Sequence, residues 1–226
     1  MAPSSSGLGR SPLKAEIAGS NPAGVTKRSF RSATAQHVPM SDVLRCDGAD
    51  EWESWLAAHW QRAEGVWLRV ARKGSGAASV TAAQALDVAL CYGWIGGTRR
   101  RLDGVHFLQW YAPRTPRSTW SRVNVDRVEA LLAAGRMRPP GLAEVEAARA
   151  DGRWDAAYPS QRHAAVPQEL LDALDYDHGA RAAFESLGPS DRYAVMLPVL
   201  RARTPEQRAR RARVAVERLA ARGSGR

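Results

Sequence analysis

The segment Cys91–Asn124, which reads CYGWIGGTRRRLDGVHFLQWYAPRTPRSTWSRVN, constrains the fold more than any other part of the chain. It gathers three tryptophans, two tyrosines and a phenylalanine among glycines, prolines and arginines. Large rings beside residues that permit tight turns or fix φ indicate a built surface rather than a connection between helices. Within the segment, residues 94–101 and 105–111 have the pattern of strands, and LDG at 102–104 predicts the hairpin turn between them.

A third strand is expected over residues 65–72, where apolar and more polar residues alternate. Helix starts are predicted at two capping boxes, one at Asp50 and one at Thr81, each followed three residues later by Glu or Gln. After Ser118 every segment has the pattern of a helix. The fold class predicted is therefore α+β: a small antiparallel sheet of about three strands with helices on one face, followed by an all-helical C-terminal unit.

This pattern divides the chain into three regions. Residues 1–37 are rich in Ser, Gly and Pro and predict a disordered tail. Residues 38–118 form the expected α+β unit, and residues 119–226 form the expected helical unit. The alternative organisation is that the last two regions make one continuous globular body.

The net charge of +10 belongs to the two ends of the chain. Residues 1–36 carry +4 and residues 201–226 carry +7, which leaves −1 for the region between them. Two cysteines without ligand-like spacing predict neither a disulfide framework nor a metal site, and we expect no cofactor. Because no apolar run approaches the ~20 residues of a membrane span and no secretory signal is evident, a cytoplasmic protein is expected.

The proline-rich stretch after the second hairpin strand is the best candidate for a binding site. Its hydroxyls, amide and arginines precede a helix N-terminus, where free N–H groups and the helix dipole favour an anion. Tryptophan rings there offer faces for a planar ligand or a guanidinium. The alternative is structural: helix caps, an arginine paired with a carboxylate, and rings that fill the core. The candidate ligand-binding residues are Trp94, Tyr111, Arg114, Ser118, Trp120, Ser121 and Asn124.

Catalytic chemistry has little support in the sequence. Asp87, Cys91 and His106 would need to converge to form a nucleophile and base, and spacing alone does not bring them together. No metalloprotease, hydrolase, P-loop or dinucleotide motif occurs. No catalytic residue is therefore assigned. The sequence favours a protein that is not an enzyme but does not decide the question.

The C-terminal segment TPEQRARRARVAVERLAARG predicts a helix from Thr204, as its N-cap, to Gly223. Its arginines allow a second function, nucleic-acid binding by phosphate neutralisation. The alternative is a solvated outer face that also pairs with nearby acids. The candidate residues for nucleic-acid binding are Arg208, Arg210, Arg211 and Arg213.

A series of short motifs resembles the YdeI/OmpD-associated, or bacteriocin-protection, family. The resemblance covers about residues 50–222 and keeps the family's order. It rests on Trp94-Ile95-Gly96-Gly97, Pro113-Arg114-x-Pro116-x-Ser118-x-Trp120-Ser121-x-x-Asn124, Gly135-Arg136-Met137, Asp151-Gly152-Arg153-Trp154 and Thr204-Pro205-Glu206-x-Arg208.

The resemblance implies a bacterial protein without a known catalytic mechanism, acting in resistance to bacteriocins or cationic antimicrobial peptides. It implies an envelope-related protein partner or a small anion as the bound species. Where relatives usually have an aspartate, this chain has Gly96, so a function that needs that carboxylate is in doubt. The alternatives are an enzyme acting on a small anionic substrate at the Arg114 and Trp120 pocket, and nucleic-acid binding by the C-terminal helix.

Overall fold

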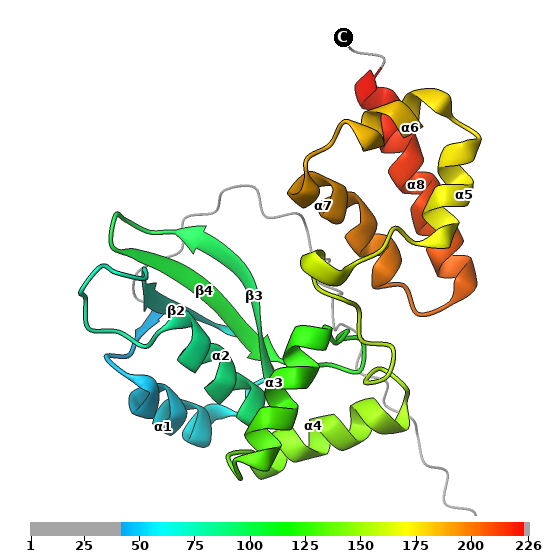
Figure 1. Ribbon diagram of the computed structural model, residues 1–226. Coiled ribbons are helices and arrows are strands. Elements are labelled where there is room, and N and C mark those ends of the chain that lie inside the picture. Colours follow the sequence, from blue (N-terminus) through cyan, green and yellow to red (C-terminus); the bar gives the residue numbers. More distant parts are fainter. Residues whose placement is uncertain (1–41, 224–226) are drawn as a thin grey trace, which may run out of the picture. The chain divides into compact units, whose positions relative to one another are not determined.

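The computed structural model describes residues 42–223, and contacts place Val38–Arg226 in one compact unit. The tail predicted over residues 1–37 lies outside the described residues. The α+β class is confirmed: a four-stranded open sheet with helices precedes a C-terminal region that is helical (Figure 1).

The sheet has the strand order β1-β2-β4-β3. Strands β2, β4 and β3 are antiparallel neighbours, and β1 pairs in parallel with β2, so the sheet is mixed. The three predicted strands are all present, and β1 is a fourth that the sequence pattern did not indicate. The strands are β1 Val43–Arg45, β2 Val66–Ala71, β3 Trp94–Arg101 and β4 His106–Pro113.

Four helices accompany the sheet, and side chains from all four share one hydrophobic core with its strands. On the covered face Trp52 of α1 packs against Tyr111 of β4, with ring centres 5.4 Å apart. The capping box at Thr81 and Gln84 is confirmed. The cap predicted at Asp50 is wrong: the N-cap of α1 is Gly48, two residues earlier, so Asp50 lies in the first turn. The helices are α1 Ala49–His59, α2 Ala82–Cys91, α3 Arg122–Ala133 and α4 Pro139–Ala150.

The C-terminal helices have a core of their own, built around α8, which packs against the three helices before it. Thr204 caps α8 as predicted, since its hydroxyl accepts from the Gln207 N–H. Pro198 occupies the last turn of α7, which ends two residues later. Gly188 is the N-cap of α7. The elements are the 3₁₀ turn η2 Gln161–His163, and α5 Gln168–Asp175, α6 His178–Glu185, α7 Pro189–Leu200 and α8 Pro205–Gly223.

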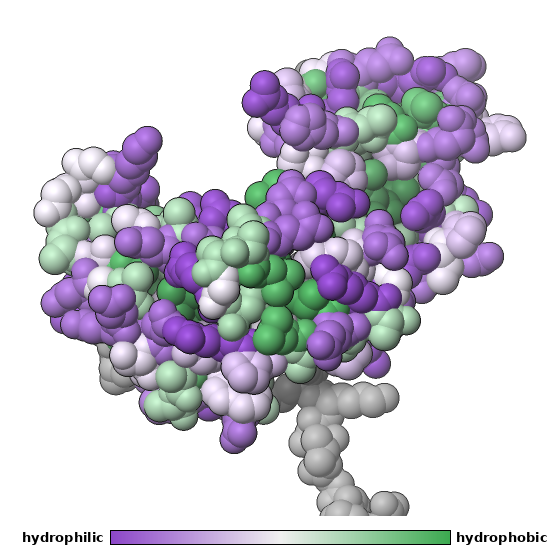
Figure 2. Space-filling view, turned by 60° about the horizontal axis from the view of Figure 1, so that its bottom comes forward, coloured by the Kyte–Doolittle hydropathy of each residue, from purple (hydrophilic) through white to green (hydrophobic). Residues whose placement is uncertain are grey.

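The surface carries both hydrophilic and apolar residues. In the space-filling view of Figure 2, apolar residues gather in small patches between hydrophilic ones, including on the helical part at the upper right. Among residues 42–223, no helix combines the length and the apolar character that crossing a membrane requires.

Candidate functional site

Arg114 follows directly after β4 and is buried, with 8% of its surface exposed. Its guanidinium lies over the Trp120 ring, with the central carbon 3.5 Å from the ring centre. One terminal nitrogen donates to the carbonyl of Thr119 at 3.3 Å. The other two guanidinium nitrogens, Nε and Nη2, find no hydrogen-bond partner among the described residues. Burial lowers the pKa of Arg114 to about 10, since desolvation disfavours the charged form.

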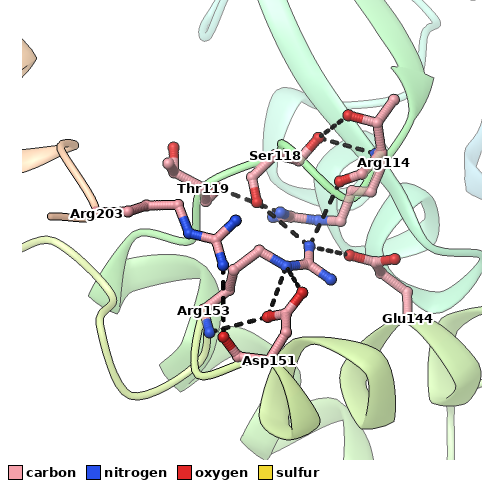
Figure 3. A network of polar contacts seen from close by, with 8 residues as sticks. Arg114, Ser118, Thr119, Glu144, Asp151, Arg153 and Arg203 are labelled. Atoms are coloured by element: carbon pink, nitrogen blue, oxygen red, sulfur yellow. Dashed lines mark hydrogen bonds and ion pairs between the residues drawn. The ribbon is translucent and has the colours of Figure 1, made fainter. Parts of the chain in front are cut away.

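Arg153 is the second buried arginine, and carboxylates surround it (Figure 3). Its Nε donates to Asp151 at 2.7 Å, and its Nη1 donates to Glu144 at 2.8 Å. The same Nη1 lies within 3.4 Å of the carbonyls of Thr115 and Ser118, at the turn that follows Arg114. Burial by itself would lower the pKa of Arg153. The two carboxylates outweigh burial and hold this pKa above its ordinary value.

A cavity of about 160 Å³ opens beside these groups. Two more arginines reach it from the segment between α7 and α8: Arg201 donates to the Thr119 hydroxyl at 3.0 Å, and Arg203 donates to the Asp151 carbonyl at 3.4 Å. The residues that line the cavity include Thr119, Trp120, Arg153, Tyr158, Arg201 and Arg203. We refer to this cavity as the Trp120 pocket.

The Trp120 pocket has a positive balance. Four arginines lie at it or directly behind it, namely the two buried ones, Arg201 and Arg203, whereas the carboxylates are Glu144 and Asp151. Each of Arg153, Arg201 and Arg203 keeps at least one guanidinium nitrogen that donates to no described residue. Free guanidinium donors of this kind match the oxygen atoms of carboxylates and phosphates.

The structure brings together part of the predicted site. Trp120 lines the pocket, Arg114 lies behind it, and Ser118 shapes the preceding turn by accepting from the Thr115 N–H at 2.9 Å. Ser121 caps α3 by accepting from the backbone N–H of Asn124 at 3.3 Å, so both of these residues serve the helix start.

Trp94 and Tyr111 lie in the hydrophobic core and do not line the Trp120 pocket. The indole N–H of Trp94 donates to the carbonyl of Trp60 at 3.1 Å. Tyr111 packs on Trp52, and burial raises the pKa of its phenol. Their places follow from the pleat of the sheet, because Trp94 and Tyr111 are on the face that α1 and α2 cover.

Sequence reasoning missed the residues that complete the pocket. Asp151 and Arg153 lie within a motif that carried the family resemblance, but no role followed from it. Glu144, Arg201 and Arg203 had no signal of their own beyond charge. Each comes from a segment far along the chain from Trp120, so only the tertiary fold reveals the set.

The groups considered for acid–base chemistry are separate from one another. His106 pairs with Asp103 at 3.3 Å on the β3–β4 turn, and Asp87 pairs with Arg127 at 2.6 Å. Cys91 is buried, and burial raises the pKa of its thiol. Within the described residues no cluster of three or more His, Cys, Asp or Glu side chains is placed to hold a metal ion.

The arginines predicted for nucleic-acid binding divide into two pairs. Arg208 donates to the Ala202 carbonyl and lies 3.7 Å from Glu169, and Arg211 donates to the Pro198 carbonyl at 2.7 Å. Arg210 and Arg213 form no hydrogen bond or ion pair with the described residues. Half of this set is therefore hydrogen-bonded within the helical unit, and of the four only Arg208 has a carboxylate partner among the described residues.

Fold and site together define an α+β protein that ends in a helical domain and holds an arginine-rich pocket. Residues 163–222, which include α5 to α7 and all but the last residue of α8, match the family model described as bacteriocin-protection, YdeI or OmpD-associated. The C-terminal helical region is thus similar to the YdeI/OmpD-associated family.

Residues 44–144 match a different family model, a domain of unknown function named DUF8412. The resemblance seen over residues 50–222 is therefore shared between two family models, and the motifs around Trp94 and Trp120 fall in the first of them. Neither the curated proteins nor the solved structures contain a match to the chain.

Proposed function

We propose that this protein binds a small anion, a phosphate or a carboxylate, in the Trp120 pocket. The observation that carries the proposal is the excess of guanidinium groups over carboxylates around a cavity of about 160 Å³, three of them with free donors. A bound anion would accept from those donors and offset the desolvation of the buried arginines. The cavity has room for a group of a few heavy atoms, not for a nucleotide.

Binding rather than catalysis fits the residues at the pocket. Its described lining includes no histidine and no cysteine, and the carboxylate of Asp151 is held by Arg153. A general base must be free to accept a proton from the bound molecule. We therefore propose no reaction at this site.

The experiment is a thermal-shift and calorimetry series with inorganic phosphate, acetate and chloride as probes. A true ligand raises the melting temperature by mass action. The double variant Arg201→Gln with Arg203→Gln is expected to lose this shift. The variant Arg162→Gln is the control, because Arg162 is an exposed arginine outside the pocket. A shift that is the same in the double variant and in the control would overturn the proposal.

The family name supplies the biological setting, and we infer a role in protection against bacteriocins or cationic antimicrobial peptides, exerted from the cytoplasm. In this proposal the Trp120 pocket is the part of the protein on which the role depends. Expression of the protein in a sensitive bacterial host is expected to raise survival under a bacteriocin or polymyxin challenge, and the Arg201→Gln, Arg203→Gln variant is expected not to. Cell fractionation checks the location. Equal survival with and without the protein would exclude the role.

A further inference from the structure

A groove in the C-terminal helical region lies between α7 and α8. Its volume is about 520 Å³. We refer to it as the α7/α8 groove. Because α8 already packs against α5, α6 and α7, the groove is an open position beside the central helix of a small bundle.

The floor of the groove is apolar and built from small residues. Helix α7 contributes Ala194, Val195 and Pro198, and α8 contributes Val214 and Ala215. Val214 is 37% exposed, so its side chain is accessible to a partner at the groove. Two alanines on facing helices allow the backbone of another helix to approach closely.

The residues that line α7 are spaced as one face of a helix, from Asp191 to Pro198, and those on α8 run from Arg210 to Leu219. At 1.5 Å per residue these faces extend about 10 to 14 Å, which is two to two and a half helical turns. A groove of this length between two helices is long enough to bind a third helix.

The rim of the groove is strongly positive. Three arginines line it, Arg210, Arg211 and Arg218, against one carboxylate, Asp191. Arg211 is fixed by its hydrogen bond to the Pro198 carbonyl at 2.7 Å. Arg210 and Arg218 form no hydrogen bond or ion pair with any described residue. Their charges are therefore available to interact with a partner or with water.

We propose that the α7/α8 groove binds a short amphipathic helix with an acidic face, supplied by a protein partner. Leucine-like side chains of that helix cover the apolar floor, and its carboxylates pair with the arginines of the rim. Charge complementarity selects this partner over a basic helix, and the apolar floor selects it over nucleic acid, which presents phosphates but no apolar stripe. The proposal does not depend on the Trp120 pocket, because the two cavities share no lining residue.

The test uses three labelled peptides of about 14 residues, long enough to span the groove, in fluorescence anisotropy with the full-length protein. The first has leucines and alanines on one helical face and glutamates on the other. The second replaces the glutamates with lysines, and the third is the first with its sequence scrambled so that the apolar stripe is lost. Only the first is expected to bind, and its affinity is expected to fall as salt screens the rim arginines.

Two variants of the same helix separate the groove from general charge. Arg218→Glu is expected to weaken binding about tenfold or more, because a rim charge is reversed. Arg213→Glu makes the same change at an exposed arginine of α8 outside the groove, and a change below about twofold is expected. Val214→Glu is expected to abolish binding through the apolar floor. The Arg201→Gln, Arg203→Gln variant is expected to bind the peptide normally, which keeps this result apart from that of the anion pocket.

Three results would overturn the proposal. The first is equal binding of the acidic, basic and scrambled peptides, or none by the acidic one. The second is an equal effect of Arg213→Glu and Arg218→Glu. The third is a dimer in analytical ultracentrifugation that Val214→Glu dissociates, since a second copy of the chain would then occupy the groove.

Discussion

Arg114 and Trp120 form a buried cation–π pair, with the guanidinium carbon 3.5 Å from the ring centre. The two carboxylates nearest this pair, Glu144 and Asp151, are bound to the neighbouring Arg153 instead. Attraction to the ring face replaces part of the hydration that Arg114 loses on burial. The two buried arginines therefore have different partners, and their substitution is expected to have different consequences.

Replacement of Arg153 by methionine leaves Glu144 and Asp151 without their cation. The variant Arg153→Met is therefore expected to lose about 2 kcal/mol of unfolding free energy, because removing one partner of a buried pair leaves the other charge uncompensated. Both carboxylates keep some exposure to water, 17% and 37% of their side chains, which limits the loss. Chemical denaturation with urea measures it.

Arg114→Met is the matched comparison, because it removes a buried charge that no carboxylate pairs with. Methionine retains most of the contact with Trp120 without the cost of desolvation. Its unfolding free energy is expected to stay within about 1 kcal/mol of the natural protein. A loss as large as that of Arg153→Met would show that the cation–π pair stabilises the fold strongly.

Gly141 marks the closest approach of α4 to α2. A Cβ atom there would meet the carbonyl oxygen of Cys91 at 2.2 Å, and backbone cannot yield as a side chain can. Gly141→Ala is expected to cost about 2 kcal/mol through overpacking, measured by thermal or urea unfolding.

Gly179 in α6 is the control glycine. A Cβ there would have Asp177 Oδ1 as its nearest neighbour, at 3.4 Å, which is an ordinary contact. Because alanine favours helix more than glycine does, Gly179→Ala is expected to be neutral or to stabilise by less than about 1 kcal/mol. Similar losses at the two sites would contradict the tight contact between α4 and α2.

Trp52 anchors α1 in the core through packing and through one hydrogen bond. Its side chain is fully buried, and its indole N–H donates to the Ala85 carbonyl at 3.0 Å. Trp52→Phe is expected to cost about 2 to 3 kcal/mol, because it leaves a cavity and removes this hydrogen bond. Trp60→Phe, at a side chain 38% exposed, is expected to cost less than about 1 kcal/mol. Equal effects in urea unfolding would argue against the position of α1.

Stability is expected to decline in alkaline solution through Cys46. Burial raises the pKa of this thiol from 9.0 to about 11, and Glu51 and Asp47 add to the effect. Between these two values the unfolded chain loses the proton while the folded protein keeps it. The contribution of the thiol to folding is therefore complete below pH 9 and is lost as the pH rises towards 11.

The measurement is urea unfolding at a series of pH values between 8 and 11 for the natural protein and for Cys46→Ala. The variant is expected to lose less stability across the series, since it lacks the thiol but retains the other groups that titrate there. Parallel declines in the two proteins would assign the effect to those other groups.

Local signals in the sequence predicted the local parts of the fold. The capping box at Thr81 and the N-cap at Thr204 each depend on residues within one turn, and the structure confirms them. The prediction at Asp50 was wrong because α1 already includes Ala49, the residue before it. A good capping residue alone therefore did not fix the helix boundary. Strand β1 has only three residues, and its pairing partner in β2 lies more than 20 residues away.

The candidate site was predictable only in part for the same reason. Arg114 and Trp120 lie close in sequence, so their composition indicated a site. Arg153 and Arg203 approach them only after α3, α4 and the C-terminal helices have formed. Arg153 lies in a motif of the family resemblance and Arg203 precedes another, but neither motif says which groups these arginines approach in the fold.

The parallel pairing of Val43–Arg45 with β2 has a consequence for anyone who shortens the chain. These three residues cover the backbone N–H and C=O groups of β2 that would otherwise form the margin of the sheet. A fragment beginning at α1 would expose that margin to strands of other molecules, and self-association is the usual outcome. A fragment that includes β2 should therefore start upstream of Val43.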